Sequence, residues 1–306
     1  MKKNYAILLI LMMAAPCLFA QNSEGQETEE EEKNWVMKGS AQQNLNQLTF
    51  TNWAAGGENS FSSNSRIRFS ADYNQENVSW ENSVDMSYGV IKIEDNPMRK
   101  NTDRIELFSK YGRKASSRVS YSSVLNFQTQ FDRGYNYPND SVVVSRFMAP
   151  GFLTLSLGLD YKPFDYLSIF FSPASGKATF VLDDELSEKG VFGVDEGDKF
   201  KPEFGALLRL EFEKEVVTNV DVKSRLILFN SYTDPEASNR KNSDVDWTFD
   251  IDFKINSFLT ATIGMHLLYD DAIKIEKTDD QGQEYLGPTT QLKQNFGIGL
   301  IYSFER

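Results

Sequence analysis

The 306-residue chain has very few of the side chains that build most metal centres, with one cysteine, Cys17, and one histidine, His266. These counts exclude a disulfide scaffold, a thiolate zinc site and a polyhistidine metal site. Acidic residues outnumber basic ones by 44 to 32, and the formal net charge of −12 disfavours a general nucleic-acid partner. The mean hydropathy of −0.44 disfavours a helical membrane protein. We therefore expect no metal, no cofactor and no nucleic acid.

A long apolar run occurs at the start of the chain, where Lys2 and Lys3 precede residues 6–20. A short basic segment, an apolar segment and a small residue at the cut are typical of a secretory signal peptide, which we place at 1–20. The run is shorter than the ~20 residues of a spanning helix, which disfavours a membrane anchor. Pro16 directly before Cys17 disfavours a lipidated cysteine. An exported chain that loses its thiol with the signal suits an oxidising periplasm.

Residues 21–41 are polar and acidic and include the uninterrupted run Glu29–Glu32. Like charges repel, and the segment has too few apolar side chains to form a core, so we predict a disordered periplasmic tail. The domain prediction is thus a signal peptide at 1–20, a tail at 21–41 and a β-barrel at 42–306.

Strict alternation of apolar and polar residues dominates the rest of the chain. Residues 245–255 show it clearly, because Val245, Trp247, Phe249 and the following odd positions are apolar while the even positions are mostly charged. Successive side chains of a strand point to opposite sides, so each segment has one apolar and one wet face. Many of these segments reach a dozen residues, longer than the ~5–6 residues usual in soluble proteins and enough to cross a membrane.

We expect about twelve strands, near 42–53, 60–74, 78–93, 103–114, 117–131, 151–163, 166–173, 203–214, 218–231, 245–256, 258–270 and 291–304. The links between them alternate between short and long. That alternation, with an even strand number, predicts a single all-β antiparallel transmembrane barrel with tight periplasmic turns and long surface loops. The low mean hydropathy follows, because half of every strand faces the wet interior.

Aromatic residues near the strand ends predict the girdles of such a barrel at the two membrane surfaces. They are Trp53, Tyr73, Trp80, Tyr88, Tyr121, Tyr269, Tyr302 and Phe304. The alternative is a soluble periplasmic sandwich or lipocalin-like barrel, whose strands would be shorter and whose apolar face would point inward.

The polar face of the strands carries charges of both signs, which we expect to line the lumen. The candidates are Arg66, Arg68, Glu81, Asp85, Arg104, Glu106, Arg209, Glu211, Asp250 and Asp252. Two interpretations follow. The charges cross-pair and fill a narrow barrel, or they line a path for a small polar solute.

A short motif after the first strand contains Asn52, Trp53, Gly56, Gly57 and Asn59. The two glycines permit positive φ and so a sharp reversal between strands. With the alternating strands that follow, this motif resembles the Bacteroidetes-type outer-membrane barrels of the domain-of-unknown-function 3078 family. The resemblance implies an outer-membrane location and a barrel fold, and it supplies no activity and no catalytic residues.

Other features suggest chemistry only weakly. His266 would face the lumen, where Asp270 on the same strand lies roughly 13 Å away, too far to orient its ring. The acidic loop segments 183–185, 195–198, 270–271 and 279–280 match no calcium-loop spacing, so solvated acidic loops are favoured over sites that hold Ca²⁺ or bridge lipopolysaccharide.

We therefore predict a non-enzymatic outer-membrane barrel, either a narrow pore for small polar solutes or a structural subunit of an envelope complex. The alternatives are an outer-membrane lipid hydrolase or deacylase that uses His266, and an adhesion or binding protein that uses its surface loops. The expected partners are outer-membrane lipid and lipopolysaccharide, with other envelope proteins possible. The sequence leaves the oligomeric state open.

Overall fold

The computed structural model describes residues 34–51, 57–137, 139–234, 239–278 and 283–306. The chain divides into two compact units, Met1–Lys33 and Asn34–Arg306. The first unit lies outside the described residues, and so do the predicted signal peptide and most of the predicted tail. No helix in the described part of the chain is long and apolar enough to cross a membrane.

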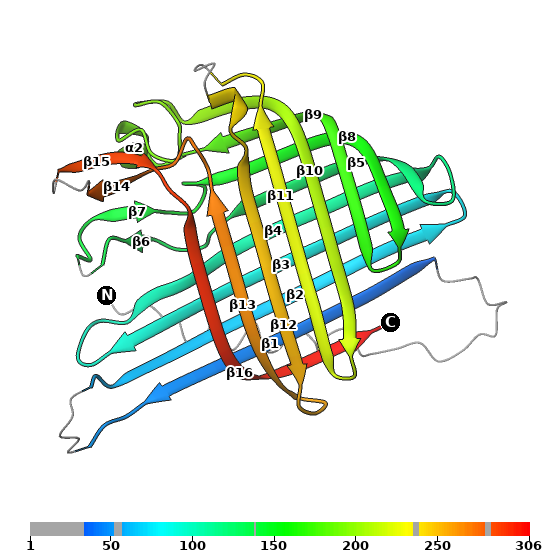
Figure 1. Ribbon diagram of the computed structural model, residues 1–306. Coiled ribbons are helices and arrows are strands. Elements are labelled where there is room, and N and C mark those ends of the chain that lie inside the picture. The colour runs from blue at the N-terminus through cyan, green and yellow to red at the C-terminus, as the bar shows by residue number, and fades with distance from the viewer. Residues whose placement is uncertain (1–33, 52–56, 138, 235–238, 279–282) are drawn as a thin grey trace, which may run out of the picture. The chain divides into compact units, whose positions relative to one another are not determined.

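Twelve strands of the second unit close into one antiparallel barrel (Figure 1). Their order around the barrel is β1-β2-β3-β4-β5-β8-β9-β10-β11-β12-β13-β16, and β16 pairs with β1. The strands are β1 (Trp35–Leu48), β2 (Ser60–Gln75), β3 (Val78–Ile93), β4 (Arg99–Lys114), β5 (Val119–Thr129), β8 (Gly151–Phe164), β9 (Leu167–Phe180), β10 (Phe200–Val217), β11 (Val220–Ser231), β12 (Asp244–Lys254), β13 (Leu259–Tyr269) and β16 (Gln291–Glu305). The predicted fold class and strand number are confirmed.

The first strand lies earlier in the sequence than predicted. β1 starts at Trp35 and ends at Leu48, whereas we placed the first strand near 42–53 and the barrel boundary at 42. Its outward series begins with Trp35, Met37, Gly39 and Ala41, and the two small residues hid the alternation. The ring of Phe304 lies against Gly39, where an added Cβ would sit only 2.3 Å from a ring carbon. Residues 35–41 therefore belong to the barrel and not to a tail.

The two ends of the barrel differ in the way their strands are joined. Tight turns follow β2, β4, β8, β10 and β12, and the segments after β1, β3, β5, β9, β11 and β13 form the opposite end. The longer of these segments contain the hairpins β6 (Gly134–Tyr135) with β7 (Val143–Ser145) and β14 (Lys274–Thr278) with β15 (Glu284–Pro288), and the helices α2 (Asp184–Glu188) and η2 (Asn239–Lys241). Figure 1 shows β6, β7, α2, β14 and β15 gathered at the end away from the C-terminus. We call the two ends the turn end and the loop end.

The outer wall of the barrel is apolar and exposed. Tyr121, Phe296 and Tyr302 each expose about two thirds of their surface, at 65%, 65% and 66%. Large apolar side chains that face outward over a whole closed sheet are the arrangement of a barrel embedded in lipid, because a water-soluble barrel would turn them inward. The dry, apolar interior expected of a water-soluble barrel is therefore absent from most of the described lumen.

Aromatic side chains form a belt near each end of the outer wall. At the turn end, Trp35, Tyr73, Trp80 and Tyr111 lie directly opposite one another on four neighbouring strands. At the loop end, the ring of Tyr88 packs edge-on against Phe131 at 6.5 Å. Such belts sit at the two headgroup levels of membrane barrels.

One part of the lumen is filled by apolar side chains, which the alternation did not predict. The buried side chains Val124, Phe170, Leu207 and Phe229 pack together, and Phe108 and Ile227 lie against them. They come from β4, β5, β9, β10 and β11, on one side of the barrel. The signal in the sequence is a loss of alternation, as in residues 226–229, where consecutive residues are apolar as expected for a strand buried on both faces.

Candidate functional site: a charged lumen

The rest of the lumen contains a cavity of about 1270 Å³ that is lined by many charged side chains. Its wall reaches from Ser257 and Glu305 at the turn end to Thr102 and Pro150 at the loop end. The structure places all ten predicted lumen residues on this wall: Arg66, Arg68, Glu81, Asp85, Arg104, Glu106, Arg209, Glu211, Asp250 and Asp252. Residues near both ends of the barrel thus line the same cavity, and many of them are charged.

A first group of charges joins β2 to the opposite wall. Asp85 on β3 accepts hydrogen bonds from Arg66 Nη2 at 2.7 Å and from Arg68 Nη2 at 3.0 Å. Arg66 Nη1 also lies 3.5 Å from Asp250 Oδ2 on β12, which is not a neighbour of β2 in the sheet. This ion pair therefore crosses the lumen.

A second group of charges centres on Glu106, which is only 4% exposed. Its carboxylate lies 2.9 Å from Arg104 Nη2 and 3.0 Å from Arg225 Nη1, and it accepts a further hydrogen bond from Asn126 at 3.1 Å. Arg225 lies on β11, across the lumen from β4. Arg225 was not among the predicted lumen residues, although the alternation of Asp221, Lys223 and Arg225 on β11 was a usable signal.

The charged cavity and the apolar filling meet at Arg209. Its Nη2 donates to Glu211 at 2.6 Å, and its guanidinium carbon lies 4.1 Å from the centre of the Phe108 ring. A guanidinium over an aromatic face is attracted by the ring quadrupole. Arg209 therefore closes the apolar filling toward the cavity.

Ion pairs also close the wall of the cavity near the turn end. Glu81 lies 3.0 Å from Lys110 Nζ and 2.6 Å from Lys162 Nζ, which come from β4 and β8. Lys110 is nearly buried, at 2% exposure, and also lies 3.4 Å from Asp160. The predicted cross-pairing of lumen charges is therefore extensive, and it leaves open space beside it.

Lys293 differs from the other lumen cations. Its ammonium donates to Thr102 Oγ1 at 2.9 Å and to the carbonyl of Asn101 at 3.2 Å, across the lumen on β4. Within the described residues it has no ion pair with a carboxylate. It places a positive charge without a counter-ion near the loop end of the cavity.

His266 faces the lumen, and its carboxylate partner comes from the neighbouring strand. His266 Nε2 lies 2.9 Å from Asp246 Oδ1 on β12, whereas Asp270 accepts a hydrogen bond from Lys177 at 3.0 Å. Nucleophilic catalysis would require a hydroxyl on the other side of the imidazole. No serine in the described part of the chain forms a hydrogen bond with His266.

Acidic residues of the loop end are engaged by basic side chains. Lys199 donates a hydrogen bond to Asp184 and lowers the pKa of that carboxyl below its usual value. Lys189 does the same to Glu185, at 2.9 Å. Asp183 accepts from Arg146 Nη1 at 2.6 Å. Residues 279–280 of the predicted acidic loops lie outside the described residues.

The family motif lies at the loop end, and the structure describes part of it. Gly57 has a φ of 144° and Asn59 precedes β2, whereas Asn52, Trp53 and Gly56 lie outside the described residues. Asn59 Oδ1 accepts a hydrogen bond from the amide of Phe50 at 2.6 Å, and the Asn59 amide donates to Glu94 Oε1 at 2.7 Å. The described part of the motif thus has a structural role, because it ties the segment after β1 to the turn after β3.

Residues 45–135 match the model of a family described as protein of unknown function (DUF3078), which confirms the resemblance seen in the sequence. The curated proteins contain no match.

Among solved structures, an outer-membrane channel from Pseudomonas putida F1 is 10% identical, with 93% of this chain and 100% of that chain covered and a TM-score of 0.40. The translocator domain of the autotransporter NalP from Neisseria meningitidis is 10% identical over 96% and 95%, with a TM-score of 0.35. The NanC porin is 8% identical over 86% and 98%, with a TM-score of 0.38. These likenesses concern the barrel fold alone.

Proposed function

We propose that this chain, whose residues 45–135 match the DUF3078 family, is an outer-membrane barrel that passes small polar solutes through a narrow charged lumen. The observation that carries the proposal is the cavity itself. Residues from both the turn end and the loop end line it, and many of them are charged side chains of both signs. Rings of charged side chains are a common means of selection in membrane pores.

The apolar filling keeps this passage narrow. A barrel of twelve strands encloses more space than a barrel of eight strands, in which side chains fill the interior. Here Phe170 and Phe229 occupy the side between β9 and β11, so the solute path runs beside them, along a wall to which β1–β4, β10–β13 and β16 contribute most residues. Such a path suits small solutes and excludes large ones.

The charges favour solutes that carry both signs or none. Most lumen carboxylates are paired with an arginine or lysine, and the ion pairs Arg66–Asp250 and Glu106–Arg225 cross the path. A solute that passes them exchanges hydrogen bonds with a donor on one side and an acceptor on the other. We expect small zwitterions or neutral polar molecules to pass more readily than ions of a single sign.

A structural subunit of an envelope complex is the second candidate, and the apolar filling favours it. A barrel stiffened by an internal core and by cross-lumen ion pairs is a rigid scaffold whether or not solute passes. A pull-down of the tagged protein in mild detergent separates the candidates, because a scaffold co-purifies stoichiometrically with other envelope proteins.

Conductance in planar bilayers tests the pore directly. The purified protein should give small discrete open-channel currents, and Arg66→Ala should enlarge them because it removes the cross-lumen pair with Asp250. Arg118→Ala is the matched control, since Arg118 is exposed in the turn before β5 and does not line the cavity. A protein that inserts, and stays silent both as wild type and as Arg66→Ala, would exclude the pore and leave the scaffold.

A further inference from the structure

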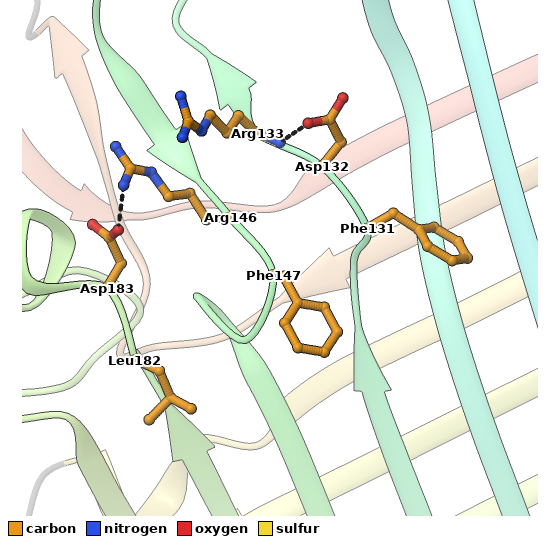
Figure 2. A pocket seen from close by; sticks show the side chains of 7 residues that line it. All are labelled: Phe131, Asp132, Arg133, Arg146, Phe147, Leu182 and Asp183. Carbon is orange, nitrogen blue, oxygen red and sulfur yellow. Dashed lines mark hydrogen bonds and ion pairs between the residues drawn. The ribbon is translucent and has the colours of Figure 1, made fainter. Parts of the chain in front are cut away.

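A second, smaller pocket of about 310 Å³ lies at the loop end, outside the lumen cavity (Figure 2). Its lining residues come from the segments after β5 and β9: Phe131, Asp132, Arg133, Arg146, Phe147, Leu182 and Asp183. The volume is at the lower limit of the ~300–1,000 Å³ of small-molecule pockets. A pocket of this volume fits one charged lipid headgroup together with the first carbons of an acyl chain.

Two arginines face each other on one side of this pocket. In the hairpin β6–β7, Gly134 pairs with Ser145, and Arg133 and Arg146 lie directly outside the two strands, next to this pair. Like charges close together repel one another unless something neutralises them. Figure 2 shows the two guanidinium groups on the same side of the pocket.

The carboxylates nearby neutralise only one of the two arginines. Arg146 lies 2.6 Å from Asp183 and 3.4 Å from Glu185. Arg133 has no ion pair with any carboxylate of the described residues. Asp132 does not serve it, because its oxygens accept the backbone amide of Arg133 at 2.7 Å and the hydroxyl of Tyr88 at 3.2 Å. The exposed guanidinium of Arg133 is thus left as a donor for an anion, beside the guanidinium of Arg146.

Apolar side chains form the other side of the pocket. Phe147 is 60% exposed, Leu182 is 52% exposed and Phe131 is 39% exposed. Figure 2 shows all three directed away from the guanidinium groups. Phe131 also packs against Tyr88 in the loop-end aromatic belt, so the apolar side is continuous with the surface that we assign to lipid.

The backbone that presents these groups is fixed before any ligand binds. Asp103 accepts hydrogen bonds from the amides of Phe131 and Asp132 at 2.7 and 2.9 Å. On the other side, Asp183 caps α2 by accepting from the amide of Leu186 at 3.1 Å. A site whose groups are held in place loses less entropy on binding.

We propose that this pocket binds a phosphate-bearing lipid of the outer leaflet. The phosphate lies between Arg133 and Arg146, and one acyl chain runs along Phe147 and Leu182 toward the hydrocarbon. Arginine suits the anionic head because its fork of N–H donors matches phosphate oxygens. The inference rests on the proposed membrane location, since a loop-end site next to the aromatic belt is at headgroup level only in a membrane.

Native mass spectrometry of the full protein in detergent, titrated with lipid A, measures this binding. Dephosphorylated lipid A and phosphatidylethanolamine are the comparison lipids. We expect one lipid A molecule to bind specifically, and Arg133→Gln to weaken its affinity about tenfold, because it removes charge-assisted hydrogen bonds to the phosphate. Arg118→Gln, at an exposed turn-end arginine of the same charge, is the matched control and should have no effect.

Arg133 has no ion pair to lose among the described residues, so its replacement should leave the loop folded, whereas Arg146→Gln also breaks two ion pairs. Phe147→Ser and Leu182→Ser test the chain contact independently and should weaken all acylated lipids alike. Equal binding of lipid A and its dephosphorylated form, or equal affinity of Arg133→Gln and wild type, would overturn the inference. If either result is found while the bilayer currents are intact, the lipid site is excluded and the proposed pore function is not. A protein that fails to insert into a membrane would exclude both the lipid site and the pore.

Discussion

Replacing Glu106 by glutamine should destabilise the barrel strongly, because Glu106 joins β4 to β11 across the lumen. At an effective dielectric constant of ~20, each guanidinium about 3 Å from the carboxylate contributes roughly 5 kcal/mol of attraction, before the cost of desolvation. Removing one partner of a buried ion pair typically costs ~3–5 kcal/mol. Glutamine keeps part of the hydrogen bonding, so we expect a loss of about 3 kcal/mol in the free energy of unfolding.

Glu213→Gln is the matched control for this change. Glu213 also faces the lumen and lies 3.0 Å from a lysine of the neighbouring strand, Lys223, but its side chain is 70% exposed whereas that of Glu106 is 6% exposed. Exposed pairs contribute ~0–1 kcal/mol. Urea unfolding of both variants in lipid vesicles, followed by tryptophan fluorescence, gives the two free energies.

The same two variants should also differ in ion selectivity. Without Glu106, the charges of Arg104 and Arg225 face the lumen without their shared counter-ion, so the reversal potential in a salt gradient should shift toward anions. Equal stability of the Glu106 and Glu213 variants would refute the cross-lumen pair as a stabilising element. An unchanged reversal potential would refute a solute path past Glu106.

Three further predictions follow from other parts of the barrel. Phe229→Ala removes a 5% exposed side chain of the apolar filling and should cost ~3–5 kcal/mol while it enlarges the conductance, whereas Phe296→Ala on the outer wall should change neither by much; thermal unfolding and bilayer recordings check both. His266→Ala should leave any phospholipid hydrolysis by the purified protein unchanged. If the wild type hydrolyses phospholipid and His266→Ala does not, the hydrolase hypothesis would be supported instead. Lipids brominated near the headgroup should quench Trp35 and Trp80 more than lipids brominated at the chain ends, and Trp80→Ala should remove part of that quenching; equal quenching by both lipids would contradict the turn-end belt.

Local sequence was enough to predict most of the barrel, because its causes are local. A strand with one lipid face and one wet face must alternate with period two, and the strands around Arg66, Asp85 and Asp250 do so over most of their length. The same rule placed all ten predicted charges on the lumen side. The predicted position of the first strand was wrong because Gly39 and Ala41 are too small to show an apolar face in the sequence. The ring of Phe304, on the neighbouring strand β16, covers Gly39 on the outer wall.

What the tertiary structure decided is which side chains meet across the lumen. Alternation indicates which face a residue occupies, but it does not indicate which strand lies opposite. Only the closed sheet therefore shows the pairs Arg66–Asp250, Glu106–Arg225 and His266–Asp246. The apolar filling around Phe170 depends on the same closure, because five strands each contribute a residue or two to it. Contacts between residues near in sequence follow from local chemistry, whereas contacts across a barrel depend on strand number, register and closure together.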